Sequence, residues 1–226
     1  MKLLSLNICQ GGGTRIAAIC DYLIAHDCDA LVISEFRRNA GGDQLIATLR
    51  QAGYSQFYHN DTAPKQNTVM VATKQPSTPI SMDGCSNEWS LVGASWAGIQ
   101  LVGTYFPQRK DKAGVFSTLE TMASSNLLVV GDFNTGCNIL DAEGAKFYCA
   151  DQFLNLANTI LTDLWRAHNG QKTLEFSWYS HIGNGFRIDH ALAGIKATNR
   201  CVASYYDHST RGTLTDHSAL IVELSS

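Results

Sequence analysis

The chain has 226 residues, of which 45% are hydrophobic and 16% charged, and its formal net charge is −3. A chain of this size can bury one sizeable core, and no Pro/Ser-rich linker divides it, so we expect a single domain over residues 1–226. The mild negative charge excludes a general attraction to nucleic acid or anionic membranes, but it allows an acidic site with a local basic rim.

The sequence also limits the compartment in which the chain works. No apolar run approaches membrane-spanning length, and residues 1–9 alternate like a strand rather than like a signal peptide. Seven cysteines are scattered without a Cys-x-x-Cys pair, which is typical of small core residues in a reducing compartment. We therefore expect a cytoplasmic monomer that has no membrane partner.

The first part of the chain alternates between apolar strands and an amphipathic helix. Residues 2–9 form a predicted strand, and the glycines that follow lack the Gly-Lys-Ser/Thr of a phosphate-binding loop. Thr14 is the predicted cap of a helix over 15–26. An apolar strand over 30–35 then ends in the carboxylate of Glu35.

The middle of the chain is rich in strand candidates. A helix is predicted at about 42–52, followed by strands at 54–59, 67–73, 88–96 and 98–105. A helix over about 113–124 then leads to the apolar run 127–130, which ends abruptly in Gly131-Asp132-Phe133-Asn134. Asp132 and Asn134 are two positions apart on an extended segment, so both side chains can reach one ligand. The alternative is an ordinary turn, because Asp, Asn and Gly favour turns.

The rest of the chain completes the fold prediction. Residues 143–168 are expected to be mostly helical, and strands are expected at 187–193, 199–206 and 218–224. Strands outnumber helices, and many neighbouring strands lack a crossover helix between them. This favours an α/β four-layer sandwich, in which two mixed and mostly antiparallel sheets pack face to face with helices outside.

Polar residues recur where the predicted strands end, and four of them are carboxylates. Gathered in one cleft, the carboxylates would repel one another without a cation. Oxygen ligands of this kind suit Mg²⁺, for which Mn²⁺ can substitute, whereas a single His without Cys makes zinc a poor fit. The residues are Asn7, Glu35, Tyr105, Asp132, Asn134, Asp189, Asp216 and His217.

Six short motifs in this order resemble those of the endonuclease/exonuclease/phosphatase superfamily, and the resemblance spans essentially the whole chain. The block Phe176-Ser177-Trp178-Tyr179, followed by 185–189, is similar to the exonuclease III and apurinic/apyrimidinic endonuclease branch. The six motifs are Leu-Asn at 6–7, Ser-Glu-Phe at 34–36, Gly-Thr-Tyr-Phe-Pro at 103–107, Gly-Asp-Phe-Asn at 131–134, Arg-Ile-Asp-His at 187–190 and Thr-Asp-His-Ser at 215–218.

The resemblance implies a role for each matching residue. Glu35 would be the principal metal ligand, with Asn7 beside it and Asp216 as a further carboxylate on the metal side. Asp132 would orient and deprotonate the attacking water, and Asn134 would hold the water or a phosphate oxygen.

Three further residues complete the implied site. Tyr105 would donate its hydroxyl to the phosphate, and His217, held by Asp189, would bind and neutralise a non-bridging oxygen. Catalysis by positioning and charge neutralisation needs no covalent protein intermediate.

Candidates for substrate binding lie on loops. Trp178 and Phe186 can stack on a sugar or base, or can pack in the core. His181 lies between two site motifs, where substrate contact and plain exposure are the alternatives. Arg109 and Lys110, with Lys112 in the same basic cluster, can contact phosphates or form a solvated loop.

His190 is expected to be structural. It directly follows Asp189, and consecutive residues of a strand face opposite sides.

Three departures from the abasic-site branch affect the expected substrate. The chain is shorter and its segment 179–186 is clipped where that branch has a longer DNA-probing loop, Gln108 stands where Asn is usual, and the overall charge is mildly acidic. These departures count against abasic-site specificity and favour tolerance of single strands, nicks or ends. We predict a Mg²⁺-dependent phosphodiesterase of nucleic acid, and expect a DNA nuclease with endonuclease or 3′-exonuclease activity, of which abasic-site cleavage in DNA repair is one form. The alternatives are an RNA-directed nuclease, a small-molecule or phosphoinositide phosphatase with the same core, a non-enzymatic binding module and a metal-stabilised scaffold.

Overall fold

The computed structural model describes residues 1–82 and 84–225. One six-stranded sheet has the strand order β13-β14-β1-β2-β4-β3. In it, β1 runs parallel to β2 and the other neighbours are antiparallel. Its strands are Lys2–Asn7 (β1), Ala30–Phe36 (β2), Gln56–His59 (β3), Thr68–Thr73 (β4), Cys201–Asp207 (β13) and Ala219–Leu224 (β14).

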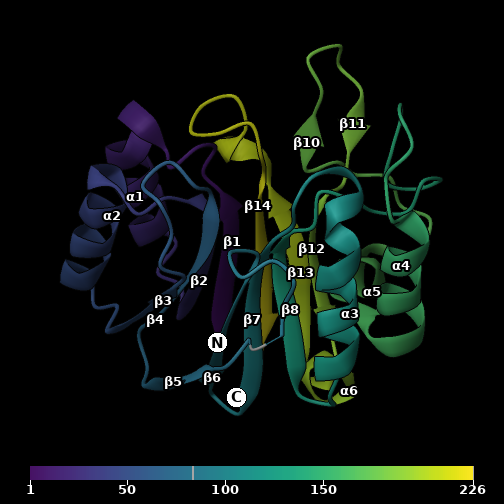
Figure 1. The fold of residues 1–226 in the computed structure, drawn as a ribbon, viewed down its shortest axis with the longest axis horizontal. Helices are drawn as coiled ribbons and strands as arrows, with labels where there is room; N and C mark the ends of the chain where they lie inside the picture. The colour runs from purple at the N-terminus through teal and green to yellow at the C-terminus, as the bar shows by residue number, and fades with distance from the viewer. Residues whose placement is uncertain (83, 226) are drawn as a thin grey trace.

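A second six-stranded sheet has the order β5-β6-β7-β8-β12-β9, with β7 parallel to β8 and the remaining pairs antiparallel. Its strands are Ser77–Ile80 (β5), Leu91–Trp96 (β6), Ile99–Tyr105 (β7), Leu127–Asp132 (β8), Thr162–Asp163 (β9) and Asp189–Ala193 (β12). A small hairpin of Trp178–Tyr179 (β10) and Gly185–Phe186 (β11) projects beyond this sheet (Figure 1).

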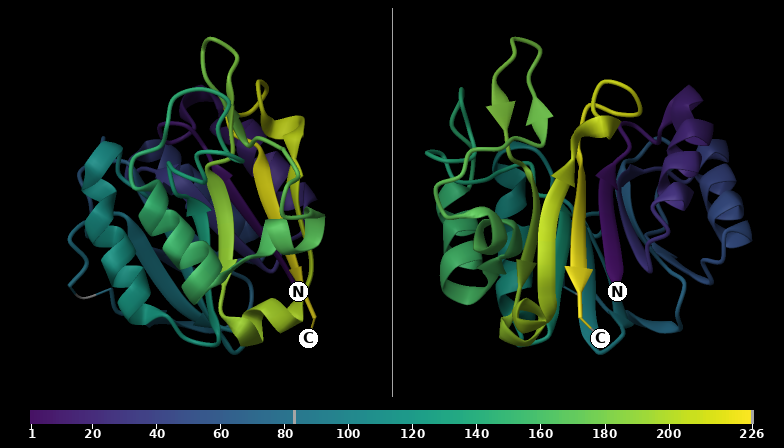
Figure 2. Two further views of the ribbon diagram at one scale, coloured as in Figure 1. Left: turned by 90° about the vertical axis from the view of Figure 1, so that its right-hand side faces the viewer. Right: turned by 180° about the vertical axis from the view of Figure 1, so that it is seen from behind.

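The helices are short. The first two α-helices pack on the outer face of the first sheet and the next two on that of the second, whereas the fifth contacts strands of both sheets (Figures 1 and 2). The α-helices are Ile16–Ala25 (α1), Ala40–Gln51 (α2), Ala113–Met122 (α3), Ala150–Asn155 (α4), Leu164–Asn169 (α5) and Ile195–Arg200 (α6). Shorter helical turns are Gly13–Arg15 (η1), Arg109–Lys112 (η2), Leu156–Ile160 (η3) and His208–Thr210 (η4). Among the described residues, no helix combines the length and apolar character that crossing a membrane requires.

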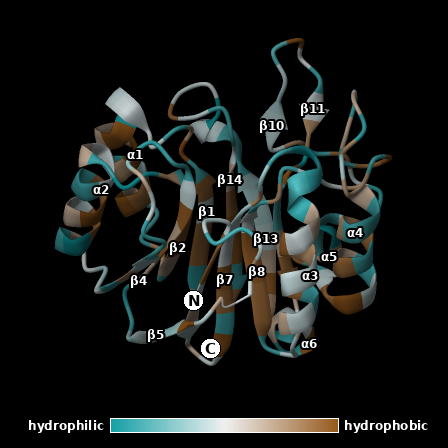
Figure 3. Cartoon of the chain, viewed as in Figure 1, coloured by the Kyte–Doolittle hydropathy of each residue, from teal (hydrophilic) through white to brown (hydrophobic). Residues whose placement is uncertain are grey.

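Three buried clusters hold the four layers together. The largest lies between the sheets, where Val32 and Val71 of one sheet meet Leu101 and Val130 of the other. A second cluster joins the first sheet to α1 and α2, and a third joins the second sheet to α3 and α4. The strands are accordingly strongly apolar, while the helices carry polar residues on their outer sides (Figure 3). The predicted four-layer sandwich is therefore confirmed.

Several sequence predictions about local structure are wrong. Thr14 does not cap α1, because it lies within η1 and the cap position is Arg15, which makes no side-chain cap bond. Residues 143–149 are irregular, and β9 interrupts the expected helix between η3 and α5. The strand predicted at 88–96 begins only at Leu91, and β5 and α6 had no clear periodic signal because each is short.

The seven cysteines are all free thiols, as predicted. Three are buried and four are partly buried, so not all of them are core residues.

Candidate active site

Three of the predicted site residues lie in one row across the second sheet. Tyr105 ends β7 and is paired in register with Asp132 at the end of β8, which is paired in turn with Asp189 at the start of β12. Gly131 makes this end of β8 possible. Its φ is +145°, and a Cβ there would lie 2.1 Å from the carbonyl oxygen of Thr104, so only glycine fits before Asp132.

Glu35 comes from the first sheet, where β2 carries a bulge. The pairing of β2 with β4 shifts between Ser34 and Phe36, and Glu35 has a φ of +56°, which is uncommon for a residue with a Cβ. Bulges re-aim side chains and concentrate near active sites. Here the bulge turns Glu35 away from the alternation of β2 and into the cleft, where it is one of the lining residues.

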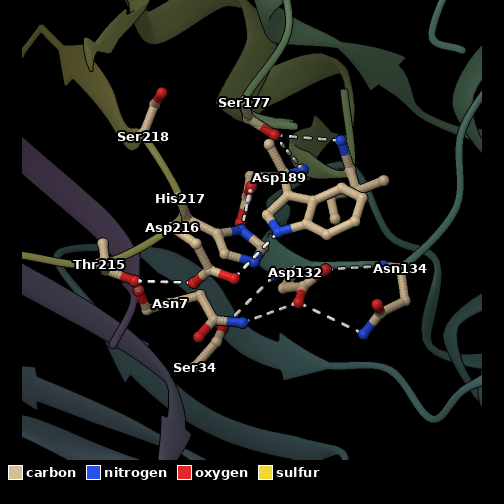
Figure 4. Close-up of polar contacts among 12 residues, drawn as sticks. Asn7, Ser34, Asp132, Asn134, Ser177, Asp189, Thr215, Asp216, His217 and Ser218 are labelled. Atoms are coloured by element: carbon tan, nitrogen blue, oxygen red, sulfur yellow. Dashed lines mark hydrogen bonds and ion pairs between the residues drawn. The ribbon is translucent and has the colours of Figure 1, made fainter. Parts of the chain in front are cut away.

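Asn7 links the carboxylates of the two sheets. Its Nδ2 donates to Asp132 Oδ2 at 2.9 Å and to Glu35 Oε1 at 3.3 Å, while its Oδ1 accepts from the Cys9 amide. Thr215 in turn donates to the Asn7 carbonyl oxygen, which ties the segment before β14 to the end of β1. Figure 4 shows Asn7, Asp132, Asp216 and His217 around a common space.

His217 and Asp189 form a buried pair. His217 Nδ1 lies 2.8 Å from Asp189 Oδ2, and both side chains are almost completely buried. Burial alone would lower the pKa of His217, but the charge of Asp189 and its hydrogen bond raise that pKa to about 10. The ring is therefore a cation at neutral pH, with Nε2 left to meet an anion.

Asp132 is also fully buried, and its pKa is raised as well. For a carboxylate, a raised pKa favours the neutral form and not the charged one. Burial first, and then the charge of Asp189, raise the pKa of Asp132 to about 7, although His217 and the Asn134 amide act against this rise. A carboxylate with a raised pKa is a better proton acceptor at neutral pH. Tyr105 has a raised pKa because of burial and the Glu35 charge, so its hydroxyl stays protonated and can donate.

All four polar groups of Asn134 are engaged. Its amide N donates to Asp132 Oδ1 at 2.8 Å, and its Nδ2 donates to the carbonyl oxygen of Phe106 at 2.9 Å. Its Oδ1 accepts from Gln108 Nε2, and its carbonyl oxygen accepts from Lys112 Nζ, each at 2.6 Å. Asn134 has a φ of +50°, and this set of bonds holds it in that conformation. In this arrangement Asn134 orients Asp132.

The site opens into a cleft of about 450 Å³. Of the predicted substrate-binding residues, Trp178, Phe186 and Arg109 line this cleft, whereas Lys110 and His181 do not. Asp216 lines it too, and its Oδ2 accepts from the Trp178 indole N–H at 3.0 Å. This bond fixes the indole plane at the cleft wall.

Sequence reasoning missed some residues that support the site. Asn67 donates to Glu35 Oε2 at 2.8 Å and so helps to hold the bulged carboxylate. Lys146, Phe147 and Tyr148 line the cleft from the irregular segment where a helix was expected. No local pattern marks these positions, because each contact joins segments distant in the sequence.

His190 is structural, as expected. It is fully buried, its Nε2 lies 2.9 Å from the Thr135 carbonyl oxygen, and its ring packs against Phe133 and Phe153.

The residues fit a hard divalent ion. Asn7 Nδ2 bridges Glu35 and Asp132, Asp132 is paired in register with Asp189, and Asp216 lines the same cleft as Glu35. Within the described ranges, no three His, Cys, Asp or Glu side chains are arranged to enclose an ion. Mg²⁺ usually takes one or two carboxylates and keeps water or substrate oxygens in its other positions, so it does not require a cage made only of protein side chains.

A buried ionic cluster supports the site from behind. It consists of Arg166, Arg187, Asp141 and Asp163. Arg187 Nε lies 2.7 Å from Asp141 Oδ1 and its Nη2 lies 2.6 Å from Asp163 Oδ2. Because Arg187 is two residues before Asp189, the cluster anchors the start of β12.

The two-sheet sandwich has counterparts among solved structures. No model of a known protein family matches the sequence. Three solved structures, each 18% identical in sequence, match the whole chain over their own whole length. They are an AP endonuclease from Archaeoglobus fulgidus (TM-score 0.80), the 3′ phosphatase NExo from Neisseria bound to a product DNA hairpin (0.81) and the 3′–5′ exonuclease from Neisseria meningitidis (0.78). The likeness establishes the fold that the motifs predicted.

Proposed function

We propose that this protein is a Mg²⁺-dependent phosphodiesterase that hydrolyses nucleic acid, and that it acts on DNA as an endonuclease or 3′-exonuclease. The observation that carries the proposal is the row of Tyr105, Asp132 and Asp189, with His217 held 2.8 Å from Asp189 beside the same cleft. Three structural neighbours whose names denote an AP endonuclease, a 3′ phosphatase and a 3′–5′ exonuclease support DNA as the substrate.

In this proposal the metal is held by Glu35, with Asn7 and Asp216 nearby. When bound, Mg²⁺ would polarise the phosphate and offset negative charge on the leaving oxygen. Glu35 is oriented for such a role by Asn67 and by the Gln10 amide, both of which donate to its Oε2.

The chain's own residues supply the remaining parts of hydrolysis. Asp132 accepts a proton from the attacking water, and Asn134 keeps the Asp132 carboxylate in place. His217, as a cation, donates from Nε2 to a non-bridging phosphate oxygen, and Asp189 holds the ring in that orientation. The Tyr105 hydroxyl donates a hydrogen bond to the same phosphate. The whole arrangement stabilises charge where it develops, without a covalent intermediate.

The test is a substrate panel with Mg²⁺ or with EDTA. It contains labelled duplex DNA, single-stranded DNA, an abasic-site duplex, RNA and a phosphoinositide. We expect DNA to be cleaved with Mg²⁺ and not with EDTA. Turnover of the phosphoinositide alone would show a phosphatase in place of the proposed nuclease, and turnover of RNA alone would show an RNA-directed nuclease. Turnover in the presence of EDTA would contradict the proposed dependence on a metal.

A further inference from the structure

Three cations of the cleft form no close ion pair with a carboxylate in the described part of the chain. Arg109, Lys112 and Lys146 all line it. Over residues 1–82 and 84–225, none of them forms an ion pair with a carboxylate, whereas both arginines of the buried ionic cluster do. Cations that remain unpaired in a concave site can bind an anion supplied from outside the chain.

Lys112 is the most informative of the three, because its side chain is only 1% exposed. Burying an ammonium group without a counterion is costly. One of its three donors reaches the Asn134 carbonyl oxygen at 2.6 Å, and the others have no partner among the described residues. Burial lowers the pKa of Lys112 to about 8, so the group is still charged at neutral pH.

The other two cations, Arg109 and Lys146, are exposed residues in segments that follow neighbouring strands. Arg109 lies after β7 and has a φ of +54°, a conformation that costs energy for a residue with a side chain and that is found at functional sites. Lys146 lies on the segment after β8. Because β7 and β8 are parallel, both segments begin at the same end of the sheet, where the two strands finish.

Lys112 lies on the Asp132 side of the cleft, away from the partners that hold Glu35. Lys112 bonds to Asn134, which in turn bonds to Asp132. Glu35 is held by a different set of partners, which come from β1, from the turn after it and from the residue before β4. Lys112 thus adjoins the place where the phosphate would be attacked, on the Asn134 side, and Arg109 and Lys146 line the same cleft.

We propose that Arg109, Lys112 and Lys146 form a binding site for a second substrate phosphate, next to the phosphate that is hydrolysed. The proposal rests on the proposed function and narrows its substrate class. The cleft is then built for a nucleic acid strand with consecutive phosphates, and an ester with a single phosphate leaves the basic group empty.

The experiment compares a trinucleotide, which has two phosphodiesters, with a dinucleotide, which has one. We expect the wild-type chain to prefer the trinucleotide in kcat/KM by about tenfold or more, since charge-assisted hydrogen bonds to a phosphate are stronger than neutral ones. The double variant Arg109→Ala/Lys146→Ala should lose most of this preference, because its kcat/KM should fall by a larger factor on the trinucleotide than on the dinucleotide.

Lys196→Ala is the matched control. It removes a single positive charge from α6, which follows the far end of β12, and it should keep the preference. Lys112→Gln is a third variant, and its thermal unfolding shows whether the fold survives the change at this buried position. In a folded variant the trinucleotide preference should also fall. Binding of a labelled DNA oligonucleotide in EDTA gives a readout without turnover, and the double variant should bind more weakly and lower the salt slope by about 1 or more.

Each outcome has a distinct meaning. A wild-type chain without a trinucleotide preference, or a double variant that keeps it, would overturn the second phosphate site. If the double variant lost kcat/KM equally on both substrates, the cations would act on the scissile phosphate, and the second phosphate site would be overturned too. Absence of all nucleic acid hydrolysis would refute the proposed function, and the EDTA binding arm would then decide the phosphate site alone.

Discussion

Asn7 and Asp132 are 125 positions apart in the chain, and a hydrogen bond of 2.9 Å from Asn7 Nδ2 to Asp132 Oδ2 joins them. Asn7 ends β1 of one sheet and Asp132 ends β8 of the other. The carboxylate to which we assign proton acceptance is therefore positioned by the docking of the two sheets, and not by its own strand alone.

Asp132→Asn should abolish turnover with little effect on folding. The amide has nearly the same shape but cannot accept the proton of water, so we expect a loss on the order of a hundredfold or more. Initial rates on the best DNA substrate measure the loss, and thermal unfolding checks the fold. Near-normal rates would show that another group is the base.

Asp189 and His217 should act as one unit. Asp189→Asn and His217→Ala each remove the cation that faces the phosphate, so the double variant should be about as slow as the slower single variant. A double-mutant cycle on kcat measures this coupling. Fully additive losses would mean that the 2.8 Å contact has no part in turnover.

Arg187→Met should strongly destabilise the protein. It leaves two buried carboxylates, Asp141 and Asp163, with less positive charge, and breaking a buried ion pair costs roughly 3–5 kcal/mol. Urea unfolding gives the change in free energy. Arg38→Met is the control, because the exposed Arg38–Asp61 pair should contribute about 0–1 kcal/mol. Equal effects of the two changes would contradict the assignment.

The same cluster gives stability a definite dependence on pH. Burial alone would raise the pKa of Asp141 and Asp163, but the charge of Arg187 overrides it and leaves both pKa values below 3.8. Carboxylates with lowered pKa values stabilise the fold above their ordinary pKa and lose that contribution as the pH falls through the folded values. The stability deficit of Arg187→Met should therefore be largest at neutral pH and shrink below about pH 4. Urea unfolding across this range tests it, and a deficit that grows in acid would contradict it.

Gly131→Ala should disrupt the site end of β8. The new Cβ would lie 2.1 Å from a backbone oxygen of β7, in addition to the strain of a positive φ. Gly212→Ala is the matched control, because its φ is +77° and its Cβ would meet nothing within 4 Å. We expect the control to lose about 1 kcal/mol and Gly131→Ala to lose more, as measured by urea unfolding. Similar losses would mean that the backbone contact relaxes easily.

Most of the candidate site could be predicted from the residues at which the apolar strands end. Buried strands have continuous apolar runs, so the polar residues at which they stop, such as Glu35 and Asp132, are visible without a structure. The two-sheet architecture followed from strands that lack crossover helices between them.

Contacts between distant segments were beyond the sequence. Asn67 and Lys112 act through hydrogen bonds to residues 32 and 22 positions away, and no periodicity encodes such pairs. The segment 143–149 looks helical by composition, but its carbonyls and amides bond to other loops, and its Phe147 and Tyr148 line the cleft. Tertiary contacts there outweigh local propensity.

The cleft draws on both ends of the chain, since Asn7 ends β1 and His217 precedes β14, the strand that pairs with β1. During synthesis, a nascent chain can build most of both sheets before β14 emerges. It cannot yet place the histidine cation against the phosphate or close the first sheet around β1. In the proposed function, hydrolysis therefore requires that β1 and β14 have paired.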